Sequence, residues 1–236
     1  MDVLGEVEDL EFTDEQKDFV DFAVSGYSKQ IDEKFKGQPI REKVGALYDA
    51  IDELNKEALA LDPNNKPSCR KGCAHCCHIQ VAATEWEVET VLDYMDHNGM
   101  EFDEKDIQKL ERLALVKSDR EYMVHPDRKC VFLGDDNTCT IYEARPAACR
   151  NYFVFSNPEE CDTYKQVGAG KVLTFFNINS LAPIVTLMAK SPLGPFQNQI
   201  LKLLKQRKTN GIRNSQNATP DNIAECQLHT GEQSQE

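Results

Sequence analysis

The side chains best suited to chemistry lie in one short stretch, Cys69–Cys77, which reads Cys-Arg-Lys-Gly-Cys-Ala-His-Cys-Cys. Buried cysteines usually behave as small apolar residues that scatter through a core, whereas these thiols are concentrated in a polar segment. A thiolate is a soft ligand that suits zinc, iron–sulfur clusters and copper(I). We therefore predict metal binding by this group together with a second, more widely spaced group. The predicted ligands are Cys69, Cys73, Cys76, Cys77, Cys130, Cys139, Cys149 and Cys161.

The spacing within the first group limits which thiols can share one metal ion. Cys73 and Cys76 have the C-x-x-C spacing that commonly offers two thiolates to one metal. The neighbours Cys76 and Cys77 are expected to point in different directions, so that one of them serves a second site or is not a ligand. A closed zinc site and a [4Fe–4S] cluster both take four cysteines. The expected cofactor is therefore zinc or iron, with a [4Fe–4S] cluster as one form, in one centre or in two.

Four polar residues accompany the cysteines. His75 and His78 flank the first group, and we expect loop residues or hydrogen-bond partners of the ligands rather than direct ligands. Arg145 and Arg150 occur in the second group, where we expect them to compensate the negative charge of a thiolate centre. An ion pair with a nearby acid such as Glu143 is the alternative.

Composition and charge exclude several classes of partner. The chain has 236 residues and a formal net charge of −13, which disfavours nucleic acid and anionic membrane surfaces. Met1–Leu10 lacks the basic and apolar regions of a secretory signal, and no stretch has the ~20 apolar residues that span a bilayer. We expect a cytoplasmic protein, in which clustered cysteines more often bind metal than form disulfides. The expected partner is a metal ion, and the ninth cysteine, Cys226, is expected to be dispensable.

Amphipathic helices are predicted to position the cysteine segments. Apolar residues recur at helical spacing over 14–35 and 41–61, which predicts a helical hairpin before the first cysteine group. Thr84 and Glu87 have the form of a capping box, which predicts the start of a third helix that ends at Asn98-Gly99.

The second half of the chain is predicted to be more irregular. A fourth helix begins at Asp103, and its segment ends at His125-Pro126. Residues 131–133 and 138–142 are predicted to pair as a small hairpin, and residues 143–149 to form a helical turn. The remaining predictions are a strand or helix at 172–176 and helices at 180–190 and 195–208.

These elements predict a mainly α fold. We expect a helical domain built around a cysteine-rich metal- or cluster-binding core, with short irregular or β-hairpin segments. The predicted boundaries are a flexible acidic N-terminus at 1–12, one domain at 13–208 with its cysteine module at 69–162, and a disordered tail at 209–236.

The order of the cysteines resembles that of the CxxxCxxCC cysteine-cluster proteins, the YkgJ-like family of zinc- or iron-chelating proteins. Cys69-x3-Cys73-x2-Cys76-Cys77 looks like the first block of that family. Cys130-Val-Phe-Leu, and then Cys139-Thr-Ile-Tyr-Glu-Ala-Arg-Pro-Ala-Ala-Cys149-Arg150, are similar to its second block. Glu160-Cys161-Asp162 is similar to its trailing element, so the resemblance spans about Cys69 to Asp162.

The resemblance implies metal or iron–sulfur binding through these cysteines, and it leaves the cellular role open. Flagellin lysine N-methylases share the cysteine motif, which implies a protein-lysine N-methyltransferase that uses the cluster as one alternative. The sequence has no recognisable S-adenosylmethionine-binding loop. A metal delivery or assembly factor is another alternative, and it would need an open, exposed site. Whether the protein is an enzyme therefore stays open.

Overall fold

The protein is mainly α, as the sequence predicts. The structure is a computed structural model that describes residues 13–61, 66–155, 157–161 and 177–217. These residues form eight α-helices, three short 3₁₀ helices and one two-stranded sheet. The predictions for 1–12, for 172–176 and for the end of the tail at 218–236 lie outside the described residues. None of the described helices is long and apolar enough to cross a membrane.

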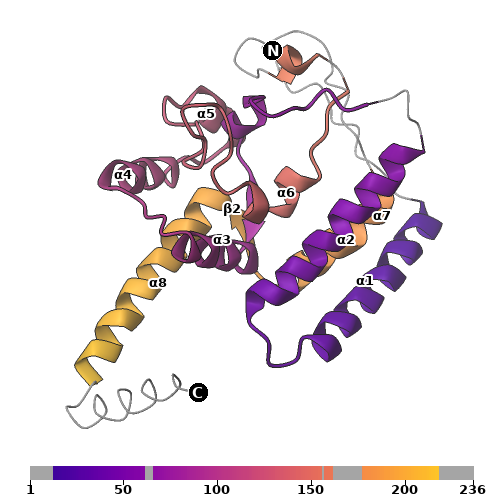
Figure 1. Cartoon of the computed structure of the whole chain (residues 1–236), viewed down its shortest axis with the longest axis horizontal. Coiled ribbons are helices and arrows are strands. Elements are labelled where there is room, and N and C mark those ends of the chain that lie inside the picture. The colour runs from indigo at the N-terminus through magenta and orange to yellow at the C-terminus, as the bar shows by residue number, and fades with distance from the viewer. Residues whose placement is uncertain (1–12, 62–65, 156, 162–176, 218–236) are drawn as a thin grey trace, which may run out of the picture.

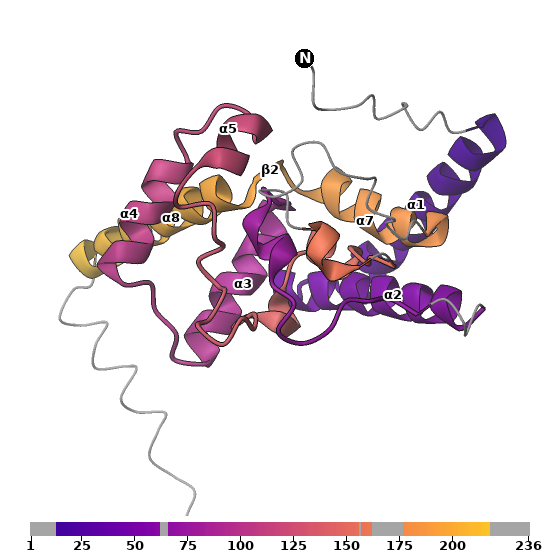
Figure 2. The same cartoon turned by 90° about the horizontal axis from the view of Figure 1, so that it is seen from above.

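Three helices form a group at one side of the molecule. Helices α1 (Asp14–Lys34) and α2 (Ile40–Ala60) are the predicted hairpin, and both pack against α7 (Ile178–Lys190), as Figures 1 and 2 show. Helix α1 begins at a capping box made by Thr13 and Gln16, whose side chains each accept from the other's backbone N–H. The core of this group includes Ile31, Val44, Leu47, Ile51 and Leu187.

A second group of helices lies beside the first. Helix α3 (Glu85–His97) packs against α2 and against α8 (Phe196–Asn217), and α8 also packs against α4 (Glu104–Leu113) (Figure 1). The predicted segment from Asp103 to His125 is broken after α4, because Ser118 caps a separate short helix, α5 (Asp119–Val124). Helix α8 continues to Asn217, beyond its predicted end at residue 208.

A small antiparallel sheet joins segments that are far apart in the chain. Strand β1 (Ala82–Thr84) pairs with β2 (Leu193–Pro195), with Ala83 opposite Gly194. The backbone N–H of Phe196 then donates to Val81 O at 2.8 Å, which places the start of α8 beside the start of α3. The sequence analysis missed this pairing, because three-residue strands carry almost no alternation signal.

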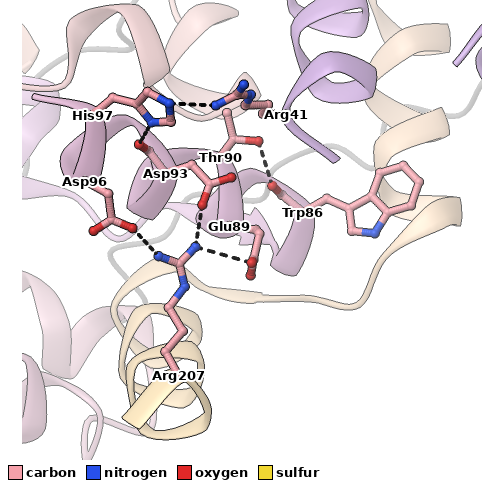
Figure 3. A network of polar contacts seen from close by, with 8 residues as sticks. All are labelled: Arg41, Trp86, Glu89, Thr90, Asp93, Asp96, His97 and Arg207. Atoms are coloured by element: carbon pink, nitrogen blue, oxygen red, sulfur yellow. Dashed lines mark hydrogen bonds and ion pairs between the residues drawn. The ribbon is translucent and has the colours of Figure 1, made fainter. Parts of the chain in front are cut away.

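Polar contacts hold α3 on both of its sides (Figure 3). At the start of α2, Arg41 Nη1 lies 2.9 Å from His97 Nε2 at the end of α3. On the other side, Arg207 of α8 contacts three carboxylates spaced along α3, those of Glu89, Asp93 and Asp96, at 3.3, 2.6 and 2.8 Å. Helix α3 is thus connected to both helix groups, and the cysteine segments begin directly before it.

Candidate metal centre

The first cysteine group is shaped by a strand-like contact and a tight turn. The backbone N–H and the hydroxyl of Ser68 both donate to Val154 O at 2.8 Å, which fixes the chain next to Cys69. Cys73 N then donates to Arg70 O at 2.9 Å, and Gly72 in between has φ +84°. A turn with positive φ at its third residue favours glycine, so Gly72 supplies the bend before Cys73.

Cys76 and Cys77 lie on a 3₁₀ helix, η1 (His75–His78), and their side chains interact. The Cys77 thiol donates a hydrogen bond to Cys76, which lowers the pKa of Cys76 to about 7 and raises the pKa of Cys77. This interaction places the two sulfurs near each other, and the expectation that one of them serves a second site or is not a ligand stays a prediction. The tight 3₁₀ backbone brings consecutive side chains closer than an extended chain would.

The second group begins directly beside the first. Cys130 N donates to Cys77 O at 2.8 Å, which joins the two groups through the backbone. The predicted hairpin is present as a single bridge between Leu133 and Cys139, and Thr140 N donates to Phe132 O at 2.8 Å. Phe132 is buried in the core around α3 and α8, so this core positions the sulfurs of the hairpin.

The last two cysteines lie on single helical turns. Cys149 belongs to α6 (Ala147–Arg150), which begins after Pro146 and packs against α2. Cys161 ends the 3₁₀ helix η3 (Pro158–Cys161), which packs against η1, and Cys161 is buried. Both turns thus reach back to elements that precede or carry the first cysteine group.

The pKa shifts of five cysteines indicate that they lie near Cys76. Burial is the main cause that raises the pKa of five of them, to about 11 for Cys130 and Cys161. In each of the five the negative charge of Cys76 raises the pKa further, and a like charge acts in this way only from nearby. The five are Cys69, Cys130, Cys139, Cys149 and Cys161.

The donor set fits a soft metal, although the side chains do not form a closed ligand set. All eight cysteines are free thiols. Within the described residues, no three His, Cys, Asp or Glu side chains are arranged so that they could hold a metal ion. Neutral thiols do not attract one another, and ligation replaces their protons by the metal. Eight sulfur donors around one region suit zinc or iron in their chemistry, and binding would require their side chains to turn inward.

The two arginines of the second group have different roles. Arg145 follows the 3₁₀ helix η2 (Tyr142–Ala144), and its guanidinium carbon lies 3.9 Å from the centre of the Tyr142 ring. Its positive charge acts to lower the pKa of Cys76, after the hydrogen bond from Cys77, and it also opposes the rise in the pKa of Cys139. Arg145 Nε is buried without a hydrogen-bond partner in the described part of the chain. This position agrees with the expected charge compensation.

Arg150 serves the scaffold instead. Its Nη1 lies 2.5 Å from a carboxylate oxygen of Asp52 on α2, and its guanidinium carbon lies 4.2 Å from the centre of the Tyr48 ring. Its other nitrogens donate to the backbone carbonyls of Glu143 and Arg145. These contacts hold Arg150 against α2 and support the ion-pair alternative, with Asp52 as the acid in place of Glu143.

Glu87 is a buried acid that positions α6, and the sequence analysis recognised only its capping role. Its Oε2 accepts from the backbone N–H and the hydroxyl of Thr84 at 2.7 and 2.9 Å, as the capping box predicts. Its Oε1 accepts from Ala147 N at 2.7 Å and from the Tyr48 hydroxyl at 3.3 Å. Glu87 directly precedes Val88 at the start of the apolar face of α3, and this position was the signal that its side chain is buried. A buried carboxylate needs several hydrogen-bond partners, so a second partner beyond Thr84 was to be expected.

The histidines near the cysteines have local roles. His78 Nδ1 lies 3.1 Å from Ala74 O, within the same helical turn. His125 Nδ1 accepts from Asp127 N at 3.1 Å, which is the contact of a turn residue. For His78 a backbone partner agrees with the expectation that it is not a ligand.

A comparison with known protein families identifies the same part of the chain that carries the cysteines. Residues 68–168 match the model of the family CxxCxxCC, which is described as "Putative zinc- or iron-chelating domain". This match contains both cysteine groups and confirms the resemblance to the cysteine-cluster family over that segment. No curated protein and no solved structure matches the chain. The site and the match together define a mainly helical protein with a cysteine-cluster domain, and they indicate zinc or iron chelation.

Proposed function

We propose that this protein binds zinc or iron through its eight clustered cysteines, with iron held singly or in an iron–sulfur cluster. The observation that carries the proposal is the gathering of thiols from separate parts of the chain around Cys76. Packing alone does not account for so many sulfurs in one polar region, because apolar residues would fill a core at lower cost.

The scaffold supports this proposal. Ile141 and Phe132, in the hairpin around Cys139, belong to the core of α3 and α8, whereas Ala147, next to Cys149, belongs to the core of α1, α2 and α7. A bound zinc ion would supply a cross-link between these two cores, and a cluster would also supply electron transfer. The thiols would hold the group, while Arg145 would offset part of their negative charge.

Metal analysis tests the proposal directly. The protein is purified without oxygen, and its zinc, iron and acid-labile sulfide are measured together with the visible absorption spectrum. We expect zinc or iron bound to the wild-type chain, and a loss of most of it in Cys76→Ser. The matched control is Cys226→Ser, which removes a thiol outside the family match and should keep the metal. A wild-type chain that binds neither metal under these conditions would refute the proposal.

Metal delivery is a second candidate, favoured by the exposure of Cys69 at the edge of the site. A thiol that solvent and a partner can reach allows ligand exchange, whereas a closed structural site loses its metal slowly. Transfer of zinc to a chelator should then slow in Cys69→Ser and should stay unchanged in Cys226→Ser. Equal rates in the two variants would remove the support for delivery. Protein-lysine N-methyl transfer stays a prediction from the resemblance alone.

A further inference from the structure

Helix α1 carries a face that no described part of the chain covers. Its inward face is built from Tyr27, Ile31 and Phe35, which pack in the core with α2 and α7. Ile31 is the one buried residue of α1, whose whole length the structure describes. Figure 1 shows α1 as the outermost helix of its group. A surface helix normally places polar and charged side chains on its outer face, and α1 departs from that pattern.

Two phenylalanines lie on the outer face of α1. Phe22 is 81% exposed and Phe19 is 45% exposed. From Phe22 to Ile31 the helix makes about two and a half turns, so Phe22 points directly away from the core. One turn after Phe22, a carbon added at Gly26 would meet nothing within 4 Å. The open hollow at this position is lined by Gly26, Lys29, Gln30, Glu33 and Lys34. An apolar projection and a hollow thus lie side by side on one face.

The two ends of α1 differ in charge. Residues 14–21 carry four acids and one lysine, whereas residues 29–34 carry two acids and two lysines. One of the acids in the second stretch, Asp32, is ion-paired with Lys190 of α7. The outer face therefore begins acidic and ends with Lys29 and Lys34 in excess over Glu33. A helix with this charge distribution repels a parallel copy of itself and attracts an antiparallel one.

We propose that the outer face of α1 binds a second copy of this chain, helix against antiparallel helix about a two-fold axis. With the axis at the level of Val24, Phe22 of each copy lies opposite the hollow at Gly26 of the other. The same register places Phe19 opposite Lys29, whose aliphatic chain covers apolar surface while its charge stays in water. A two-fold contact uses one patch on both copies, so each of these matches is made twice.

The charges of the outer face agree with this register. Asp14 of one copy lies opposite Lys34 of the other. Glu15 lies opposite Glu33, and Lys29, one turn before Glu33 on the same helix face, offsets that repulsion. The contact is about as long as α1, roughly 30 Å, and it is small for a protein interface. A reversible dimer follows rather than a permanent one.

Sedimentation equilibrium of the full chain tests the proposal. All samples contain a reducing agent and the same Zn²⁺ concentration, so that disulfides do not link the copies and metal content does not differ. We expect a monomer–dimer equilibrium that Phe22→Glu weakens at least about tenfold, because both copies lose a buried ring. The matched control is Leu115→Glu, after α4, where an apolar side chain is 75% exposed. This control should dimerise as the wild-type chain does.

Charge reversal tests the pairing of the two ends. One variant carries Asp14→Lys and Asp18→Lys, and the other carries Lys29→Glu and Lys34→Glu. All four side chains are exposed, so both variants should keep the helix content of the wild-type chain in circular dichroism. Each variant has like charges at both ends of α1, and we expect its self-association to weaken at least about tenfold. An equimolar mixture should restore pairing as a mixed dimer, counted by native mass spectrometry.

Several results would overturn the proposal. A wild-type chain that stays monomeric at every concentration refutes it, and so does a dimer that Leu115→Glu weakens and Phe22→Glu does not. A monomer that loses stability in Phe22→Glu would show that its own chain covers this face, which also refutes the proposal. A mixture of the two charge variants without a mixed dimer refutes the register. None of these results bears on metal binding, because α1 contains no cysteine.

Discussion

The buried carboxylate of Glu87 gives the sharpest test of how the scaffold holds the candidate metal centre. Glu87→Ala would leave the backbone N–H groups of Thr84 and Ala147 without their acceptor, and both residues are buried. A buried donor that loses its partner costs about 1–3 kcal/mol, so we expect a loss of about 4 kcal/mol in the free energy of unfolding. Glu87→Gln keeps one acceptor oxygen and turns an amide N–H toward the other donor. We therefore expect a loss of about 2 kcal/mol in the free energy of unfolding.

Equilibrium urea unfolding followed by circular dichroism measures these losses, at the same free Zn²⁺ concentration for every variant because bound metal adds to stability. The matched control is Glu89→Ala on the same helix. Glu89 meets only one nitrogen of Arg207, at 3.3 Å, and both side chains are about one third exposed, at 34% and 31%. Such a pair contributes about 0.5 kcal/mol. A loss below about 1 kcal/mol in Glu87→Ala would contradict the assigned hydrogen bonds.

Three further substitutions test the turn at Gly72, the contacts of Arg207 with α3 and the charge of Arg145 near the cysteines. Gly72→Ala places a residue with a side chain at a backbone φ of +84°. We expect a loss of about 1–2 kcal/mol in the free energy of unfolding, measured in urea, and weaker zinc binding. Gly45→Ala, inside α2 with open space around the added carbon, should be neutral or stabilising, and equal effects of the two changes would refute the turn argument. Arg207→Ala removes three partly exposed ion pairs; we expect a loss of about 1–2 kcal/mol that shrinks in about 1 M salt, and a salt-independent loss would contradict it. Arg145→Gln should weaken zinc affinity about tenfold in a chelator competition, and an unchanged affinity would show that its charge does not act on the thiolates.

Local sequence signals predicted much of the fold, and they identified the eight cysteines that lie within the family match at residues 68–168. The capping box of Thr84 and Glu87 depends on residues within a few positions of one another, and it is present. The apolar stripes of α1 and α2 were equally readable, because an apolar repeat of 3.6 residues that persists over about twenty residues is typical of an amphipathic helix and of no other regular element.

The long-range hydrogen-bond and ion-pair partners that join these elements could not be predicted from the sequence. Ala147 lies 60 positions from Glu87, and Asp52 lies 98 positions from Arg150. A charged residue in a sequence shows that it needs a partner, but not which one, since the choice depends on how the helices pack. For the same reason Arg145 and Arg150 looked alike in sequence, although Arg145 acts on Cys76 and Cys139 while Arg150 forms an ion pair with Asp52.

The hydrogen bond from Cys130 to Cys77 also sets the order in which the centre can be assembled. It closes a loop that contains α3, α4 and α5, and the entropy of closing that loop opposes it until those helices have folded. The thiols of Cys69–Cys77 need no such closure, so we expect a nascent chain to offer them to a metal ion before the second group. An ion bound by these local thiols before the loop closes would have to exchange ligands to reach the second cysteine group. We therefore expect the timing of metal supply to affect how the chain folds.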